Sequence, residues 1–187
     1  FVYLAMEVRT GKTLTSLGIA NRTPCSNLLF LTKKKAISSI QEDYDLLNPE
    51  YNITVINYES IHKIKQTGWD VVVCDEAHTL GAFPKPNKRA RQVKEILTRS
   101  APLVILLSGT PTPESYSQMF HQLYGIQGSP FKKFKNFYAF ARVYVNVTQR
   151  KINSLFINDY SKGLQSIIDD VAPYKINYTQ KMAGFKT

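Results

Sequence analysis

The chain has 187 residues, of which 43% are hydrophobic and 20% are charged. This balance is typical of a globular domain and excludes an intrinsically disordered chain, and no apolar run approaches the roughly 18 residues that a membrane span needs. The net charge of +10 favours a polyanionic partner such as nucleic acid, with a basic protein that lacks such a partner as the alternative. The only two cysteines, Cys25 and Cys74, and the absence of a leader pattern at the start predict a cytoplasmic protein.

Apolar runs alternate with helix-compatible stretches over the first two thirds of the chain. The runs predict strands at residues 2–6, 28–31, 54–57, 71–74 and 103–107. The stretches between them predict helices at residues 12–21, 34–47, 88–100 and 115–125. Continuous apolar runs suit strands that are buried on both faces of a parallel sheet. We therefore expect a doubly wound α/β domain with a mostly parallel central sheet and its ligand at the carboxyl ends of the strands.

The pattern changes after residue 128. Residues 129–142 are basic and aromatic, with the aromatic side chains Phe134, Phe137, Tyr138 and Phe140. These side chains could stack on bases. Their spacing favours the other interpretation, a helix face that packs on the domain. Residues 144–156 permit a strand or a hairpin. Residues 160–171 predict an amphipathic helix with one apolar face, formed by Leu164, Ile167, Ile168 and Val171. Residues 174–178 predict a last strand, and we expect a single domain over residues 1–187.

Gly11-Lys12-Thr13 follows the first predicted strand and opens the first predicted helix. Backbone N–H groups at a helix amino terminus bind phosphate, and a lysine there can reach the β and γ phosphates. The Thr13 hydroxyl can ligate Mg²⁺, and Gly11 lets the backbone approach closely. The general phosphate-loop pattern has glycine where this chain has Met6. A chance Gly-Lys-Thr at a helix start is the alternative.

Two further motifs end the strands predicted at residues 71–74 and 103–107. Asp75 and Glu76 follow the first, where Asp75 can hold Mg²⁺ and Glu76 can act as general base on water. Acids that merely mark a strand end are the alternative. Ser108-Gly109-Thr110-Pro111 ends the second, and the hydroxyls of Ser108 and Thr110 can bridge to His78, although these residues are also ordinary turn formers.

Together these motifs resemble the first RecA-like motor domain of superfamily two helicases and DNA translocases, in particular the Snf-type branch and its phage helicase relatives. The phosphate-binding loop of that branch also lacks the first glycine, so Met6 at this position agrees with the resemblance. Residues 29–32 with the lysines that follow resemble motif Ia, residues 56–61 resemble motif Ib, residues 75–78 resemble motif II, and residues 108–111 resemble motif III. Residues 174–180 resemble the segment that leads out to a second motor domain.

The resemblance implies a P-loop NTPase with a RecA-like three-layer fold, which binds ATP and Mg²⁺. Its catalytic residues would be Lys12, Asp75 and Glu76, with Thr13 and Asp75 holding the metal and His78, Ser108 and Thr110 coupling the nucleotide site to a second ligand. The nucleotide-binding loop would comprise Arg9, Thr10, Gly11, Lys12, Thr13 and Leu14. The residues nearest nucleic acid would be Thr32, Lys33 and Tyr58.

The resemblance also implies parts that this sequence does not contain. The segment that reads the adenine would precede Phe1, and a second RecA-like domain with an arginine finger would follow Thr187. Because an arginine finger contributes on the order of 10³–10⁵ in rate, we expect little ATP turnover from residues 1–187 alone. The implied activity is ATP-driven movement on DNA, double-stranded in preference to single-stranded, in a bacterial or phage-infected cell. The alternative is a nucleotide-gated nucleic-acid-binding module whose catalysis is vestigial or completed by a partner.

Overall fold

Six parallel strands form the central sheet of the computed structural model, which describes residues 1–185. The spatial order of the strands is β3-β2-β4-β5-β1-β8, and every neighbouring pair is parallel. Their bounds are β1 Val2–Met6, β2 Asn27–Thr32, β3 Asn52–Asn57, β4 Val71–Cys74, β5 Leu103–Leu107 and β8 Lys175–Tyr178. Each predicted strand is confirmed, and the last one adds the edge strand β8 beside β1.

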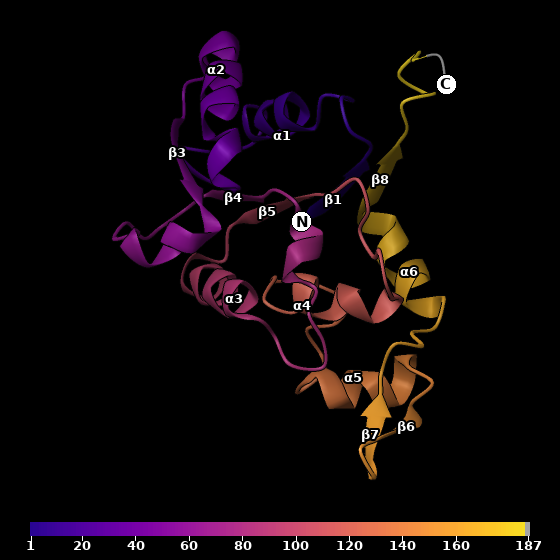
Figure 1. Cartoon of the computed structure of the whole chain (residues 1–187). Helices are drawn as coiled ribbons and strands as arrows, with labels where there is room; N and C mark the ends of the chain where they lie inside the picture. The colour runs from indigo at the N-terminus through magenta and orange to yellow at the C-terminus, as the bar shows by residue number, and fades with distance from the viewer. Residues whose placement is uncertain (186–187) are drawn as a thin grey trace.

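Helices cover both faces of this sheet, which gives three layers (Figure 1). One face carries α1 Lys12–Ala20 and α2 Ile37–Leu47, and the other carries α3 Lys88–Ser100, α4 Met119–Leu123 and α6 Ser166–Val171. The helix α5 Phe137–Tyr144 packs against α4 on the side away from the sheet. Short 3₁₀ helices occupy Lys34–Ala36, Tyr58–Lys63, Ala77–Leu80, Tyr116–Gln118 and Ala172–Tyr174. The expected RecA-like α/β architecture is confirmed.

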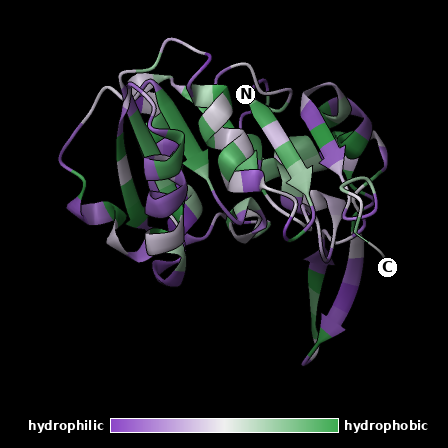
Figure 2. Cartoon of the chain, turned by 90° about the horizontal axis from the view of Figure 1, so that it is seen from above, coloured by the Kyte–Doolittle hydropathy of each residue, from purple (hydrophilic) through white to green (hydrophobic). Residues whose placement is uncertain are grey.

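The core explains why the strands are continuous apolar runs. Successive residues of a strand point to opposite faces, so Tyr3 joins the cluster under α3 and α4, whereas Leu4 joins the cluster under α1 and α2. All four residues of β4 are buried, and the central strands are largely green in Figure 2. No helix among residues 1–185 is long and apolar enough to cross a membrane.

The aromatic residues after residue 128 form a packed cluster. Phe140 is fully buried, with ring centroids 4.8 Å from Phe120 and 5.0 Å from Phe131. Phe137 is also buried, whereas Tyr138 keeps 44% of its surface exposed. The preferred interpretation of this segment, a helix face packed on the domain, is therefore confirmed for Phe137 and Phe140.

Residues 144–171 differ in part from the prediction. The expected strand or hairpin is an antiparallel hairpin, β6 Thr148–Ile152 with β7 Leu155–Asp159. The predicted helix over residues 160–171 is wrong in its first half, because α6 begins only at Ser166. Residues 160–164 are extended instead: Gly163 forms a bridge with Val145, and the hydroxyls of Ser115 and Ser117 donate to the carbonyls of residues 161 and 160.

Candidate active site

The sheet topology brings the three sequence motifs to one edge. β4, β5 and β1 are adjacent in the sheet, and Asp75, Ser108 and the loop at residues 7–11 follow their carboxyl ends. The backbone N–H of Ser108 donates to the carbonyl of Leu4 at 3.2 Å, which continues the β1–β5 ladder up to that edge. Carboxyl ends of parallel strands are where α/β proteins bind ligands.

The loop between β1 and α1 holds a lysine against its own backbone. Lys12 Nζ donates to the Glu7 carbonyl oxygen at 2.9 Å, and Thr10 Oγ1 donates to the same oxygen at 2.7 Å. Gly11 has φ +82° and Arg9 has φ +63°, so the loop turns twice through the left-handed region, where only glycine is free of strain. The six residues assigned to nucleotide binding, Arg9 to Leu14, are all at least partly exposed.

Asp75 is a partly buried carboxylate with suitable chemistry for Mg²⁺. Its Oδ2 accepts from Thr32 Oγ1 at 2.7 Å, and its Oδ1 accepts from the Glu76 backbone N–H at 3.0 Å. Burial raises the pKa of Asp75, whereas the nearby charge of Lys12 lowers that pKa. A further cation beside the carboxylate would therefore stabilise its charged form. No three His, Cys, Asp or Glu side chains gather as a metal site within residues 1–185. A Mg²⁺ ion held by Asp75 and Thr13 would therefore take its other ligands from water and phosphate.

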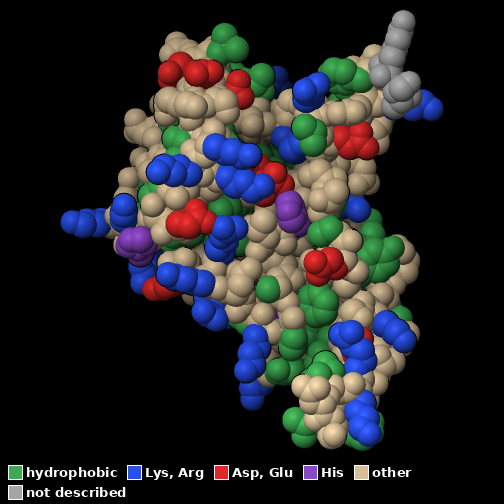
Figure 3. Space-filling view, viewed as in Figure 1, with side chains coloured by type: hydrophobic (Ala, Val, Ile, Leu, Met, Phe, Trp, Pro, Cys, Tyr) green, Lys and Arg blue, Asp and Glu red, His purple; other side chains and the backbone are tan. Residues whose placement is uncertain are grey.

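A chain of polar contacts joins motif II to motif III. His78 Nδ1 lies 3.4 Å from Glu76 Oε2 and 2.9 Å from Ser108 Oγ, which also accepts from the Thr110 backbone N–H at 3.1 Å. On the other side of Glu76, Lys33 Nζ lies 3.3 Å from Oε1. Figure 3 shows Lys and Arg side chains beside acidic and histidine side chains near the centre of this face. The contacts fit the coupling role expected of His78, Ser108 and Thr110.

Two of the residues expected near nucleic acid are buried under Asp75. Thr32 is fully buried, and its hydroxyl donates a hydrogen bond to the Asp75 carboxylate. Tyr58 is 1% exposed, and its hydroxyl donates a hydrogen bond to the Asp75 carbonyl at 2.6 Å. Arg89 covers the Tyr58 ring, with Cζ 5.5 Å from its centroid. Both side chains therefore hold motif II in this conformation, and the expectation that Thr32 and Tyr58 lie near nucleic acid stays a prediction. Lys33 has 46% of its side chain exposed and can therefore be reached by a ligand from solvent.

Two sets of residues around the site were not predicted. Glu7 accepts the Gln180 backbone N–H at 2.7 Å, the Gln180 side chain donates to the Val8 carbonyl at 2.9 Å, and the Glu7 backbone N–H donates to the Tyr178 carbonyl at 3.0 Å. These bonds join the segment after β8 to the phosphate loop. The only sequence signal was the resemblance of residues 174–180 to a segment that leaves the domain.

The second set centres on Gln122, which is 3% exposed. Its Oε1 accepts from the Tyr3 hydroxyl at 2.6 Å, and its Nε2 donates to the Pro111 carbonyl at 2.8 Å. Gln122 therefore ties motif III to α4 and β1. A glutamine in an apolar helical stretch carries no sequence signal of such a role, because its partners are distant in the chain.

Residues 4–178 match the SNF2-related domain. The chain belongs to this family. The family comprises helicase- and translocase-type ATPases, so nucleotide binding and association with nucleic acid are its general properties. The chain is also 30% identical over 106 residues to the RNA polymerase-associated protein RapA of Actinobacillus succinogenes. That match covers 57% of this chain and 11% of the relative, so the chain corresponds to a small part of that protein.

Proposed function

We propose that residues 1–187 form the ATP-binding lobe of an ATP-driven DNA translocase or helicase. The observation that carries the proposal is the meeting of Lys12, Asp75 and the Glu76–His78–Ser108 contacts at one edge of the sheet. Membership of the SNF2-related family supports it. The site residues act as follows in this proposal.

Phosphate binds at the amino terminus of α1. Lys12 gives up the Glu7 carbonyl oxygen, a neutral acceptor, for the negatively charged β and γ phosphate oxygens, which form the stronger charge-assisted hydrogen bonds. The free N–H groups of the helix and the residues from Arg9 to Leu14 complete the cradle. Thr13 and Asp75 would hold Mg²⁺, which would neutralise phosphate charge when bound. The hydrogen bonds from Thr32 and from the Glu76 N–H hold the Asp75 carboxylate in place.

Glu76 accepts a proton from the attacking water. Its carboxylate lies between Lys33 and His78. His78 also contacts Ser108, which in turn contacts Thr110, so a change at Glu76 alters the hydrogen bonds of motif III. Lys33 pairs with Glu76 and is half exposed, so a DNA phosphate that captures the Lys33 ammonium would free the Glu76 carboxylate. This exchange gives a physical reason for turnover that rises when DNA binds.

The proposed partners are double-stranded DNA, in preference to single-stranded DNA, and a second RecA-like domain of the same polypeptide. The charge of +10 supports a polyanionic partner whose binding weakens steeply with salt. The second domain would supply an arginine finger that completes the γ-phosphate site. A bacterial or phage-infected cytoplasm is the proposed setting.

Glu76→Gln in the full-length protein tests the function. Loss of the general base should lower ATP turnover by about 10²–10⁴ while ATP binding, measured with a fluorescent analogue, is kept. Glu42→Gln, an exposed change on α2, is the matched control and should leave turnover unchanged. Unchanged turnover in Glu76→Gln would contradict the motor and favour the alternative, a nucleotide-gated nucleic-acid-binding module.

A further inference from the structure

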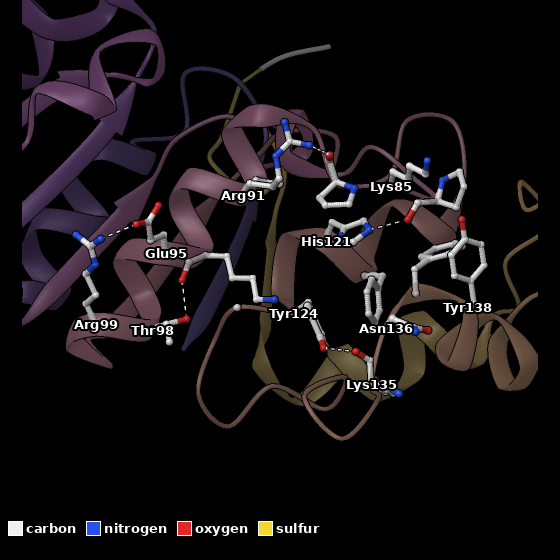
Figure 4. A pocket seen from close by; sticks show the side chains of 17 residues that line it. Lys85, Arg91, Glu95, Thr98, Arg99, His121, Tyr124, Lys135, Asn136 and Tyr138 are labelled. Carbon is white, nitrogen blue, oxygen red and sulfur yellow. Dashed lines mark hydrogen bonds and ion pairs between the residues drawn. The ribbon is translucent and has the colours of Figure 1, made fainter.

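A hollow lies among α3, α4 and the start of α5. None of the residues assigned to nucleotide binding or to coupling lines it. The cavity measures about 710 Å³, within the range of ligand pockets. Its apolar lining includes the partly exposed Pro84, Pro86, Tyr124 and Tyr138, with the buried Phe120 and Phe137 behind them. Figure 4 shows labelled side chains from α3, from α4 and from residues 135–138 grouped around the cavity.

Hydrogen bonds between elements hold the walls in place. His121 Nε2 donates to the carbonyl of residue 84 at 2.8 Å, and Arg91 Nη1 donates to the carbonyl of residue 86 at 3.0 Å. Across the cavity, the Tyr124 hydroxyl donates to the Lys135 carbonyl at 2.7 Å (Figure 4). The loop at residues 84–86, α3, α4 and the segment before α5 are thus joined without a ligand. Such a preformed cavity spares a ligand the cost of ordering its walls.

The rim of the cavity is strongly cationic. Five of the lining residues are basic and one is acidic: Lys85, Arg91, Lys94, Arg99 and Lys135, against Glu95. Glu95 is already paired with Arg99, so Lys85, Arg91, Lys94 and Lys135 have no acidic partner among the lining residues. Lys94 Nζ lies 4.5 Å from the centroid of the Tyr124 ring. The occupant must therefore combine negative charge with an apolar group.

We propose that this cavity docks an acidic peptide segment of a partner protein, with one large apolar side chain of that segment seated against Pro84, Tyr124 and Tyr138. The charges of the rim complement aspartate and glutamate, and the volume accepts a bulky side chain. Nucleic acid fits less well, because stacking needs open ring faces. Phe120 and Phe137 are buried in the aromatic cluster, and the Tyr124 ring is covered by Lys94, which leaves Tyr138 as the one exposed ring among the lining Phe and Tyr side chains.

The probe is a fluorescein-labelled peptide rich in aspartate and glutamate with one central tryptophan, titrated into the intact protein and followed by anisotropy. Lys135→Glu should weaken binding by about tenfold or more, because a like charge replaces an attractive one. Thr98→Trp, which places bulk on an exposed lining position, should weaken it similarly. Lys151→Glu on the exposed hairpin is the matched control and should change affinity less than about twofold.

A peptide with serine in place of the tryptophan should bind more weakly than the parent peptide. Absence of binding, or equal loss in Lys135→Glu and Lys151→Glu, would overturn the proposal, since the second result shows general attraction to a basic protein. The proposal also fails if a labelled oligothymidylate, and not the peptide, binds in a manner that Lys135→Glu abolishes. Circular dichroism of each variant distinguishes these results from unfolding.

Discussion

Gly81 gives a quantitative test of the packing between motif II and α4. It lies buried directly after the 3₁₀ helix Ala77–Leu80, with φ −84°, a conformation that alanine adopts without strain. A Cβ atom at this position would lie 2.7 Å from the Gln118 carbonyl oxygen, 2.9 Å from Gln118 Cβ and 3.1 Å from Gln122 Nε2. The whole cost of Gly81→Ala is therefore steric, and α4 or the end of motif II must move.

Overpacking of this kind costs about 1–3 kcal/mol. For a domain of this length, 1 kcal/mol corresponds to about 2–4 °C in Tm, so the Tm of Gly81→Ala should fall by about 2–12 °C. Thermal unfolding followed by circular dichroism measures the change. Gly18→Ala in α1 is the matched control, because its Cβ would meet nothing within 4 Å. That variant should gain about 1 kcal/mol of helix propensity. An unchanged or raised Tm in Gly81→Ala would refute the reasoning.

Two further predictions concern charge. Lys33→Ala removes the cation that lies 3.3 Å from Glu76. In the full-length protein, basal ATP turnover should therefore rise a few-fold, and the stimulation of turnover by DNA should become smaller. Unchanged stimulation would contradict the exchange of Lys33 between Glu76 and DNA. Burial lowers the pKa of His121, whose neutral ring donates to the Pro84 carbonyl, so folding stability should be constant above the unfolded pKa of about 6.5 and fall as the pH drops from there toward the folded pKa. Urea unfolding at a series of pH values should show this loss in the wild type and a smaller loss in His121→Gln, which keeps an amide donor; identical pH dependence in both would contradict it.

Much of the fold could be predicted because local pattern and burial agree. The apolar runs at β1, β4 and β5 are buried on both faces, so their bounds match the structure. The helix predicted over residues 160–171 failed for a non-local reason. Its apolar spacing is helical, but Ser115 and Ser117, more than forty residues earlier, bind the backbone of its first half in an extended form.

The site was predictable where chemistry lies in short motifs at strand ends. Asp75 and Ser108 each follow a buried strand directly, so the parallel order of the strands brings them together. The roles of Thr32 and Tyr58 were not predictable in the same way, because whether a hydroxyl faces solvent or an aspartate depends on the neighbouring strand. The same holds for Gln122, whose partners Tyr3 and Pro111 come from different parts of the chain.

The position of β1 in the sheet has a consequence for how the protein is made. Among the described strands β1 comes first in the chain, yet its two neighbours are β5 and β8, so among these strands it gains a partner only after residue 103 has emerged from the ribosome. Glu7, at the end of β1, meets Gln180 across a sequence separation of 173 residues. The phosphate loop is thus enclosed late, and a nascent chain should gain affinity for nucleotide only once residues up to Gln180 have left the ribosome.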